Sequence, residues 1–310
     1  MVVDAAHLKN LFEYARCRNL LDKKVKSLPE MHQANSIPAD IYITYFDRFS
    51  KKSQDPFFGL HFGVFLNLRA LQVLFDISLS VANVKQLAMI WKHYAKASFP
   101  LINISVAEKP STYSLIFNVP SKIASASQLA DAIIALAFRE LKVITGIDTL
   151  SITLPYSNLT EYERWFEDLV NRGKNYAITF HCPVNTIVTN NILRKRIELL
   201  LPTFLHYLNS LEIDNQSFSH KVKLMILNLY ESDFPKVAKV ASQFCLTTRT
   251  LQRKLKQEHT TYRVITNQVK QELYAYIEKD QQLKTVDVSS ILGYSSASAF
   301  LHALKSWHTV

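Results

Sequence analysis

Three cationic side chains near the carboxyl end of the chain are spaced to form one charged stripe on a helix. At about 100° per residue, Arg249, Arg253 and Lys256 fall within about 60° of one another. Leu251 and Leu255 lie on the opposite side and indicate the buried face of the same helix. Because Arg and Lys neutralise phosphates, and Arg can also bond guanine bidentately, the stripe predicts contact with double-stranded DNA.

Polar side chains at the beginning of this helix have the chemistry that reads base edges. Thr247 is a suitable N-cap, and Thr248, Thr250 and Gln252 then lie in the first turns. Gln can bond adenine bidentately, while Thr can bond a base edge or pack on a thymine methyl group. Since a recognition helix presents its N-terminal turns to the major groove, we expect DNA contacts from Thr247, Thr248, Arg249, Thr250, Gln252, Arg253 and Lys256.

The elements that must position this helix belong to a pattern that occurs twice. A short helix at about 235–244, apolar at i, i+3, i+4 and i+7, precedes the turn and should brace the next helix. The same order recurs 48 residues later before the turn, from Val240 to Val288, and 49 residues later after it, from Arg249 to Ser298. This repetition predicts two helix-turn-helix units, with one extra residue in the second turn.

The second copy keeps the pattern but is less basic. Gly293 supplies the backbone freedom that the turn requires, and Ser295 is a suitable N-cap for the last helix. Ser298, His302 and Lys305 take the positions that the cationic stripe has in the first copy. The DNA contacts expected from the second unit are Ser295, Ser296, Ser298, His302 and Lys305.

The segment between the two copies predicts a rigid spacer. Residues 262–280 contain neither Pro nor Gly and should form one continuous helix. Successive major grooves recur on one face of B-DNA about every 34 Å. A rigid helix of this kind would therefore let two readers enter neighbouring grooves.

Residues 236–307 resemble the DNA-binding domain of AraC/XylS-type bacterial transcription regulators. The matching stretches are 247–255 (TTRTLQRKL) and 292–300 (LGYSSASAF), followed by Lys305 and Trp307. The resemblance implies an all-α domain in which two helix-turn-helix units are joined by a long helix. It also implies a sequence-specific regulator of transcription.

The front of the chain is similar to the N-terminal domain of the ornithine-regulator-like, arabinose-binding-domain-like branch of the same family. The similarity lies in residues 55–63 (DPFFGLHFG), 179–180 and 191–193. It implies a small-molecule effector domain and a homodimer. The expected organisation is an effector-binding and dimerisation domain at 1–211, a short polar linker at 212–219 and the double helix-turn-helix domain at 220–310.

The pattern of the first 211 residues predicts an α+β domain, with a helical lobe beside a mostly antiparallel sheet. The expected helices are 8–21, 42–50, 66–75, 84–97, 127–144, 161–171 and 197–211, and the expected strands are 101–106, 113–119, 149–154, 176–180 and 186–189. An effector pocket between lobe and sheet would be lined by Tyr42, Phe46, Phe62 and Phe65. With 18 Phe and 14 Tyr in the chain, the alternative is that this aromatic cluster is hydrophobic core.

Length and charge agree with two domains, one of them basic. At 310 residues the chain is longer than most single cores. Its net charge is +10, and residues 219–310 hold 13 Lys or Arg against 7 Asp or Glu. The excess is concentrated where DNA binding is expected. A basic balance also suits RNA or a membrane surface, so it supports the DNA interpretation without establishing it.

Several classes of protein are disfavoured by what the sequence lacks. There is no Gly-rich phosphate loop, Gly-x-Ser-x-Gly elbow or His-Glu-x-x-His motif, so we do not expect an enzyme. The isolated spacing of the histidines predicts neither a metal site nor a cofactor; they include His61, His93 and His181. The widely spaced cysteines predict reduced, packed thiols; they are Cys17, Cys182 and Cys245. The start resembles no signal peptide, and the longest apolar run is 132–138, which predicts a cytoplasmic protein without membrane insertion.

Two functions remain open. The first is a regulator whose partners are double-stranded DNA, a small-molecule effector, RNA polymerase and a second copy of the chain. The alternative is a ligand-sensing or protein-interaction protein whose degenerate second unit no longer reads DNA. The weakly charged face of Ser298 and His302 favours the alternative, since AraC-type regulators usually have Arg at the position of His302, whereas the cationic stripe of the first unit favours the regulator.

Overall fold

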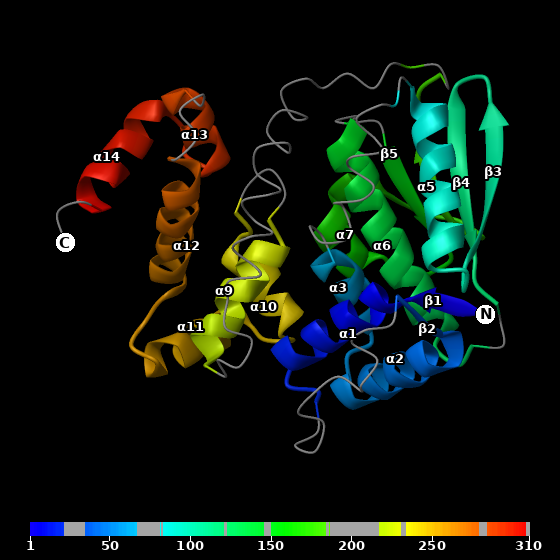
Figure 1. Cartoon of the computed structure of the whole chain (residues 1–310), viewed down its shortest axis with the longest axis horizontal. Coiled ribbons are helices and arrows are strands. Elements are labelled where there is room, and N and C mark those ends of the chain that lie inside the picture. The colour runs from blue at the N-terminus through cyan, green and yellow to red at the C-terminus, as the bar shows by residue number, and fades with distance from the viewer. Residues whose placement is uncertain are drawn as a thin grey trace. The chain divides into compact units, whose positions relative to one another are not determined.

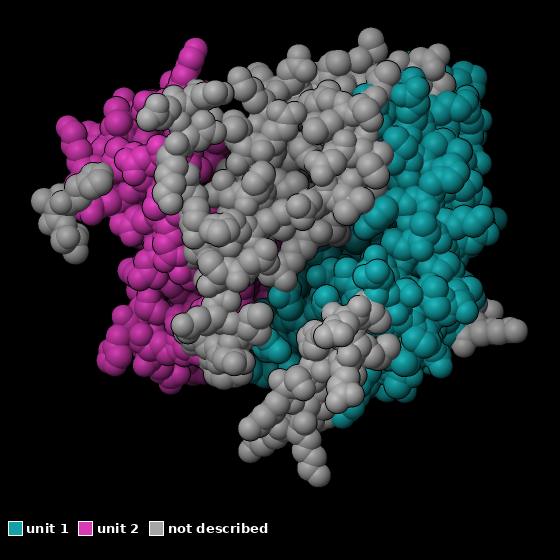
Figure 2. All heavy atoms as spheres, viewed as in Figure 1, with its two compact units in different colours: residues 1–66, 70–190 teal, residues 67–69, 191–310 magenta. Residues whose placement is uncertain are grey.

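The computed structural model describes residues 1–21, 35–66, 81, 83–120, 123–145, 150–183, 186, 217–230, 234–278 and 284–307 (Figure 1). The chain forms two compact units, called unit 1 (residues 1–66 and 70–190) and unit 2 (residues 67–69 and 191–310) (Figure 2). The helix expected at 197–211, and all but one residue of the helix expected at 66–75 and of the strand expected at 186–189, lie outside the described residues. Within the described part of the chain, no helix is long and apolar enough to span a lipid bilayer.

Unit 1 contains a five-stranded, mostly antiparallel sheet, which confirms the α+β prediction. The strands are β3 (Asn103–Lys109), β4 (Thr112–Asn118), β5 (Leu150–Leu154), β6 (Val170–Arg172) and β7 (Tyr176–Phe180). They lie in the order β3-β4-β7-β5-β6. Every neighbouring pair is antiparallel except β5 and β6, which are parallel.

One face of this sheet is covered by helices. In β4, Tyr113, Leu115 and Phe117 are buried while the side chains between them are more exposed, which is the two-residue period of a strand packed on a core. α6 (Ala126–Thr145) contacts β4, β5 and β7, and α5 (Val84–Ser98) contacts β3 (Figure 1). The ring of Trp91 in α5 lies 5.7 Å from that of Phe117, so α5 belongs to the same core.

Unit 1 also contains a helical lobe. It consists of β1 (Val2–Asp4), α1 (Ala5–Cys17), β2 (Ser36–Pro38), α2 (Ala39–Ser53) and α3 (Phe58–Phe65). Strands β1 and β2 pair antiparallel. The side chain of Asp4 caps α1 by accepting a hydrogen bond from the backbone N–H of Ala6 at 2.8 Å.

Helix α3 was not among the helices expected from sequence, and its composition explains why. All of its side chains are buried, so it has no polar face and no helical period to detect. It also contains Gly59 and Gly63, which disfavour an isolated helix. A Cβ atom at Gly59 would lie 1.8 Å from the backbone oxygen of Gln128, and one at Gly63 would lie 2.3 Å from that of Ala132. The two glycines therefore let α3 pack directly on the backbone of α6.

The helix expected at 161–171 is shorter than predicted. α7 covers Thr160–Phe166, and a single 3-10 turn, η2 (Glu167–Leu169), follows it. Glu167 has a φ of 59°, a left-handed conformation that ends the helix. Val170 then pairs with Ile152 of β5, so backbone hydrogen bonding to the sheet overrides the local helical pattern.

Unit 2 is helical in its described part, as expected. Its helices are α9 (Phe218–Asn228), α10 (Val237–Gln243), α11 (Thr248–Gln257), α12 (Tyr262–Ile277), α13 (Thr285–Ile291) and α14 (Ala297–Trp307). The segment 212–219 was expected to be a linker. Its residues 212–216 lie outside the described residues, while Ser217 caps α9 by accepting from the N–H of His220 at 3.2 Å.

Candidate nucleic-acid interface

A tight turn between α10 and α11 sets the direction of the cationic helix. Cys245 in this turn has a φ of 52°. The N–H of Leu246 returns to the carbonyl oxygen of Ala241 at 2.9 Å, which closes the end of α10. The hydroxyl of Thr247 then accepts from the N–H of Thr250 at 3.2 Å, so Thr247 is the N-cap of α11, as predicted.

The two faces of α11 divide as the sequence indicated. Leu251 and Leu255 are fully buried. Arg249, Arg253 and Lys256 are exposed. Of the remaining residues expected to contact DNA, Thr250 is half-buried, and the exposed ones are Thr247, Thr248 and Gln252. The structure therefore leaves the cations of α11 exposed, together with most of the polar side chains that are expected to read bases.

Helix α9 is fastened to the end of α11. The carboxylate of Glu258 accepts from the backbone N–H groups of Phe218 and Ser219, each at 2.7 Å. Partial desolvation raises the pKa of Glu258, but these hydrogen bonds outweigh it and hold the pKa below its usual value. The ring of Phe218 also lies 5.2 Å from that of Phe244 and 5.5 Å from the ammonium group of Lys254. We call the two hydrogen bonds of Glu258 the clasp. They could not be predicted from the sequence, because Glu258 lies about forty residues after Phe218 and Ser219.

The turn between α13 and α14 begins in a similar way to the first. The N–H of Tyr294 bonds the carbonyl oxygen of Ser289 at 2.9 Å, just as that of Leu246 bonds Ala241. Gly293 has a φ of 65° at the position that matches Cys245. Each pair is 48 residues apart, which agrees with the repeat read from the sequence.

The cap of α14 differs from the prediction by one residue. Ser295 was expected to be the N-cap, but it is the side chain of Ser296 that accepts from the N–H of Ala299, at 3.1 Å. Since Thr247 lies 49 residues before Ser296, the additional residue of the second turn stands ahead of the cap.

Helices α9 and α12 hold the second turn in place. The hydroxyl of Tyr230, at the end of α9, donates to the carbonyl oxygen of Ile291 at 2.8 Å. The ammonium group of Lys270 in α12 lies 4.1 Å from the ring centroid of Tyr294 and 3.4 Å from the carbonyl oxygen of Gly293. Tyr274, one turn further along α12, packs on Phe300 with ring centroids 5.5 Å apart.

The outward face of α14 carries less charge than that of α11. The five residues expected to contact DNA are all exposed: Ser295, Ser296, Ser298, His302 and Lys305. Leu301, which lies 49 residues after Gln252, is also exposed, with 45% of its surface accessible. The outward face of α14 therefore has one cation, Lys305, where α11 has three. It also has an apolar side chain, Leu301, where α11 has the amide of Gln252.

The aromatic residues proposed for an effector pocket are packed in the core of the helical lobe. Tyr42, Phe46, Phe62 and Phe65 are each at most 2% exposed. The ring of Phe46 lies 6.1 Å from those of Tyr42 and Phe62. These contacts agree with the alternative that the cluster is hydrophobic core. A cavity of unit 1 lies elsewhere, along α5 and α6, and is lined by none of the four.

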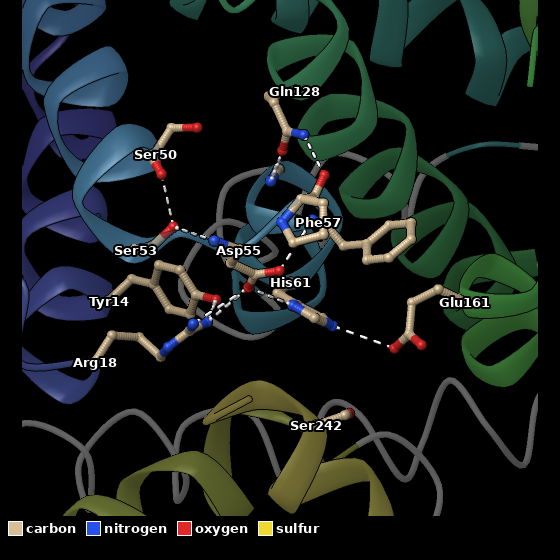
Figure 3. A network of polar contacts seen from close by, with 12 residues as sticks. Tyr14, Arg18, Ser50, Ser53, Asp55, Phe57, His61, Gln128, Glu161 and Ser242 are labelled. Carbon is tan, nitrogen blue, oxygen red and sulfur yellow. Dashed lines mark hydrogen bonds and ion pairs between the residues drawn. The ribbon is translucent and has the colours of Figure 1, made fainter. Parts of the chain in front are cut away.

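A buried polar network joins α1, α3 and α7 (Figure 3). Asp55 accepts from Arg18 at 3.2 Å and contacts Nδ1 of His61 at 2.8 Å. The other ring nitrogen of His61 lies 3.4 Å from Glu161, which pairs with Arg164. His61 looks isolated in the sequence because its partners lie six residues and a hundred residues away.

The carboxylates and the cations of this network shift one another's pKa values. Burial raises the pKa of Asp55, but the hydrogen bond from His61 and the charges of His61 and Arg18 outweigh it, so the pKa lies below its usual value. Burial lowers the pKa of His61, yet its contacts with Asp55 and Glu161 outweigh burial and raise the pKa. The network therefore holds the motif at residues 55–63 by buried charge pairing.

The cysteines do not share one environment. Cys17 is buried and Cys182 is half-buried, but Cys245 is exposed in the turn before α11. The prediction of packed thiols is therefore wrong for Cys245. Its left-handed backbone places it at the outer side of the turn rather than in the core.

Three known transcriptional regulators are similar to this chain in sequence or structure. The transcriptional regulator VqsM of Pseudomonas aeruginosa is 24% identical over 212 residues, which cover 66% of this chain and 62% of that protein. The transcriptional regulator Rv1395 of Mycobacterium tuberculosis is 32% identical over 77 residues, 25% of this chain and 22% of the relative. The solved structure of the regulator CdpR from Pseudomonas aeruginosa aligns with a TM-score of 0.44 and 20% identity, covering 98% of this chain and 95% of that one. The chain thus spans less than two thirds of the length of both curated relatives.

A family model matches half of the chain. The arabinose-binding domain of AraC transcription regulators, an N-terminal domain, matches residues 26–181, which is half of the sequence. The family and the named relatives are transcription regulators and not enzymes. The match includes the motif at residues 55–63 and every strand of the five-stranded sheet. The chain belongs to the AraC-type transcription regulators that carry this N-terminal domain.

Proposed function

We propose that this protein regulates transcription by binding specific sequences of double-stranded DNA through unit 2. In this proposal α10 with α11, and α13 with α14, are two helix-turn-helix units, and α12 is the spacer between them. A small molecule bound in unit 1 controls them. Residues 1–211 form the effector-binding and dimerisation part, residues 212–219 connect it and residues 220–310 read DNA. RNA polymerase and a second copy of the chain are further partners.

The observation that carries the proposal is the repeated turn followed each time by an exposed polar helix. The matching bonds from Leu246 to Ala241 and from Tyr294 to Ser289 end α10 and α13 in the same way, and α11 and α14 follow after these turns. A helix that projects its N-terminal turns in this way is suited to the major groove. Arg249, on the exposed side of α11, adds the charge that DNA requires.

The two units would contribute differently. In the first unit, the contacts come from Thr247, Thr248, Arg249, Thr250, Gln252, Arg253 and Lys256. In the second unit, they come from Ser295, Ser296, Ser298, His302 and Lys305. Because an Arg bonded to a base discriminates by about 1–3 kcal/mol, we assign most of the sequence specificity to the first unit.

Selection of genomic fragments by the full-length protein tests the proposal. Recovery of one sequence motif supports specific reading, and the length and symmetry of the motif report how many units are engaged. The affinity for a selected site should fall steeply with salt, with a slope of about −0.9 per phosphate neutralised. Replacing Arg249, Arg253 and Lys256 together by Ala should flatten that slope, whereas the exposed Lys109→Ala in unit 1 should leave it unchanged. Fragments without a shared motif and a slope near zero would refute the proposal.

The alternative function, a ligand-sensing or protein-interaction protein, is favoured by the face of α14. There, exposed Leu301 and His302 stand where α11 has an amide and an arginine. If α14 docks a protein instead of DNA, then Leu301→Gln should leave DNA affinity unchanged. If α14 reads DNA, the same change should alter the recovered DNA sequence motif at one of its two ends only.

A further inference from the structure

A small cavity in unit 1 lies between α5 and α6 and is also lined by His7 of α1. Its free volume is about 30 Å³, which is room for about two water-sized groups. Its walls are mainly apolar and aromatic, and they include Trp91, Phe99 and Leu136. Since His7 and Tyr94 are half-buried while the other lining residues are buried, these two side chains mark the mouth.

One polar group at the bottom of this cavity is incompletely bonded. Glu140 of α6 is 1% exposed and lines the cavity. Its Oε2 atom accepts from the indole N–H of Trp91 at 2.7 Å. No described residue bonds its Oε1 atom. A buried carboxyl oxygen is costly to leave unpaired, so the site favours an occupant that bonds Oε1.

The protonation of the lining groups decides which occupant fits. Burial raises the pKa of Glu140 to about 8, although the bond from Trp91 and the charge of Arg139 act in the other direction. Burial also lowers the pKa of His7 to about 4, although Asp4 opposes it. Both groups are therefore mainly neutral at pH 7. Because Oε2 accepts from the indole, the proton of Glu140 belongs on Oε1, where it is available for donation.

We propose that this cavity binds the polar end of a small uncharged molecule, whose carbonyl or hydroxyl oxygen accepts a hydrogen bond from Oε1 of Glu140. The apolar body of the molecule lies between the half-buried side chains of His7 and Tyr94. A charged ligand is disfavoured, because its charge would lose its hydration between walls that are mainly apolar. That the occupant acts as an effector rests on the proposed function, whereas its binding does not.

Titration of the full-length protein with small probes tests the site. The indole N–H of Trp91 is bonded to Glu140 and reports on it directly, and the chain has only three Trp residues. In ¹⁵N-Trp-labelled protein, Trp91→Phe identifies this cross-peak. Butanone and isobutanol should shift it saturably, and isobutylammonium and isobutyrate should bind at least tenfold more weakly. Equal affinities for neutral and charged probes would contradict the proposal.

Variants of the lining separate binding at Glu140 from other effects. Glu140→Leu removes the donor and should weaken the binding of butanone and isobutanol. Glu140→Gln keeps an N–H donor and should bind both with intermediate affinity. Ala95→Leu fills the cavity and should block all four probes, while the exposed Lys109→Ala should change nothing. An unchanged affinity of Glu140→Leu for butanone and isobutanol, or a Trp91 signal that no probe moves, would overturn the assignment and leave Oε1 to a water molecule.

DNA binding is measured on the same samples, so that a failure of the cavity proposal can be distinguished from a failure of the proposed function. If the probes bind as expected but a selected DNA site is bound equally well with and without them, the cavity stands and its regulatory role fails. If DNA is bound specifically while no probe shifts Trp91, the regulator stands and the cavity assignment fails.

Discussion

Glu258, at the end of α11, accepts a hydrogen bond at 2.7 Å from the backbone N–H of Phe218, which is the first residue of α9. One carboxylate thus satisfies the free N–H groups at the start of one helix while standing at the end of another. Because α9 is the first described element after residues 212–216, the clasp joins the connecting segment to the helix that we propose reads DNA.

Removing this clasp should destabilise unit 2. Glu258→Ala should lower the free energy of unfolding by about 0.5–2 kcal/mol, the usual effect of losing an N-terminal cap. Urea denaturation followed by circular dichroism measures it, and Glu163→Ala, an exposed acid in α7, is the control. The pKa of Glu258 is lowered on folding, so its contribution is present above the unfolded-state pKa and is lost as the pH falls through the folded-state value. A variant with unchanged stability at pH 7 would show that the bonds contribute nothing.

The two outward helices should differ in their effect on DNA binding. Arg253→Ala should weaken binding to a selected site by about 1–3 kcal/mol if the guanidinium meets a base. His302→Ala should have a smaller effect, because an imidazole lacks the bidentate donor geometry of a guanidinium. Fluorescence anisotropy on matched specific and scrambled duplexes measures both. An equal loss on every sequence would assign Arg253 to the backbone, and equal losses from the two variants would contradict the ranking of the units.

The close approach of α3 to α6 should tolerate no side chain at Gly59. A methyl group there would meet the backbone oxygen of Gln128, which cannot turn away as a side chain could. Gly59→Ala should therefore destabilise unit 1 by about 1–3 kcal/mol or more, as overpacking does. Thermal unfolding of the full-length protein measures the loss. Ser127→Ala, on the exposed side of α6, should be nearly neutral, and a stable Gly59→Ala protein would mean that the helices can separate at low cost.

The network around His61 should make the stability of unit 1 depend on pH. The pKa of His61 is raised above its ordinary value of 6.5, so its contribution is full below that value and is lost as the pH rises through the folded-state pKa. The pKa of Asp55 is lowered from 3.8, so its contribution is full above that value and is lost on acidification. Stability should therefore be greatest between these limits. Denaturation across pH 3–9 with His61→Asn should show a flattened alkaline limb, whereas His93→Asn, at an exposed position, should keep it.

The sequence predicted the elements whose polar and apolar residues alternate with a clear period. In α11, Leu251 and Leu255 mark one face and Arg249 and Arg253 the other, and the structure confirms both. The strand β4 was found for the same reason, because buried Leu115 alternates with more exposed neighbours. The cap at Thr247 was also correct, since capping depends on a local residue preference.

The errors arose where distant parts of the chain decide the structure. α3 has no polar face, and its glycines become intelligible only once α6 lies against them. β6 was taken for helix because its pairing partner Ile152 is far away in sequence. The cavity beside Glu140 and the network at His61 each assemble residues from three separate elements, and no spacing rule could have identified them.

The glycine contacts between α3 and α6 also constrain how unit 1 can respond to a ligand. Because the two backbones meet without intervening side chains, α3 and α6 cannot slide past each other and should move together as one rigid body. Movement between helices of unit 1 must then occur at another contact. The contact between α5 and α6 is made by side chains and contains a cavity, so a bound molecule would displace these helices most easily there.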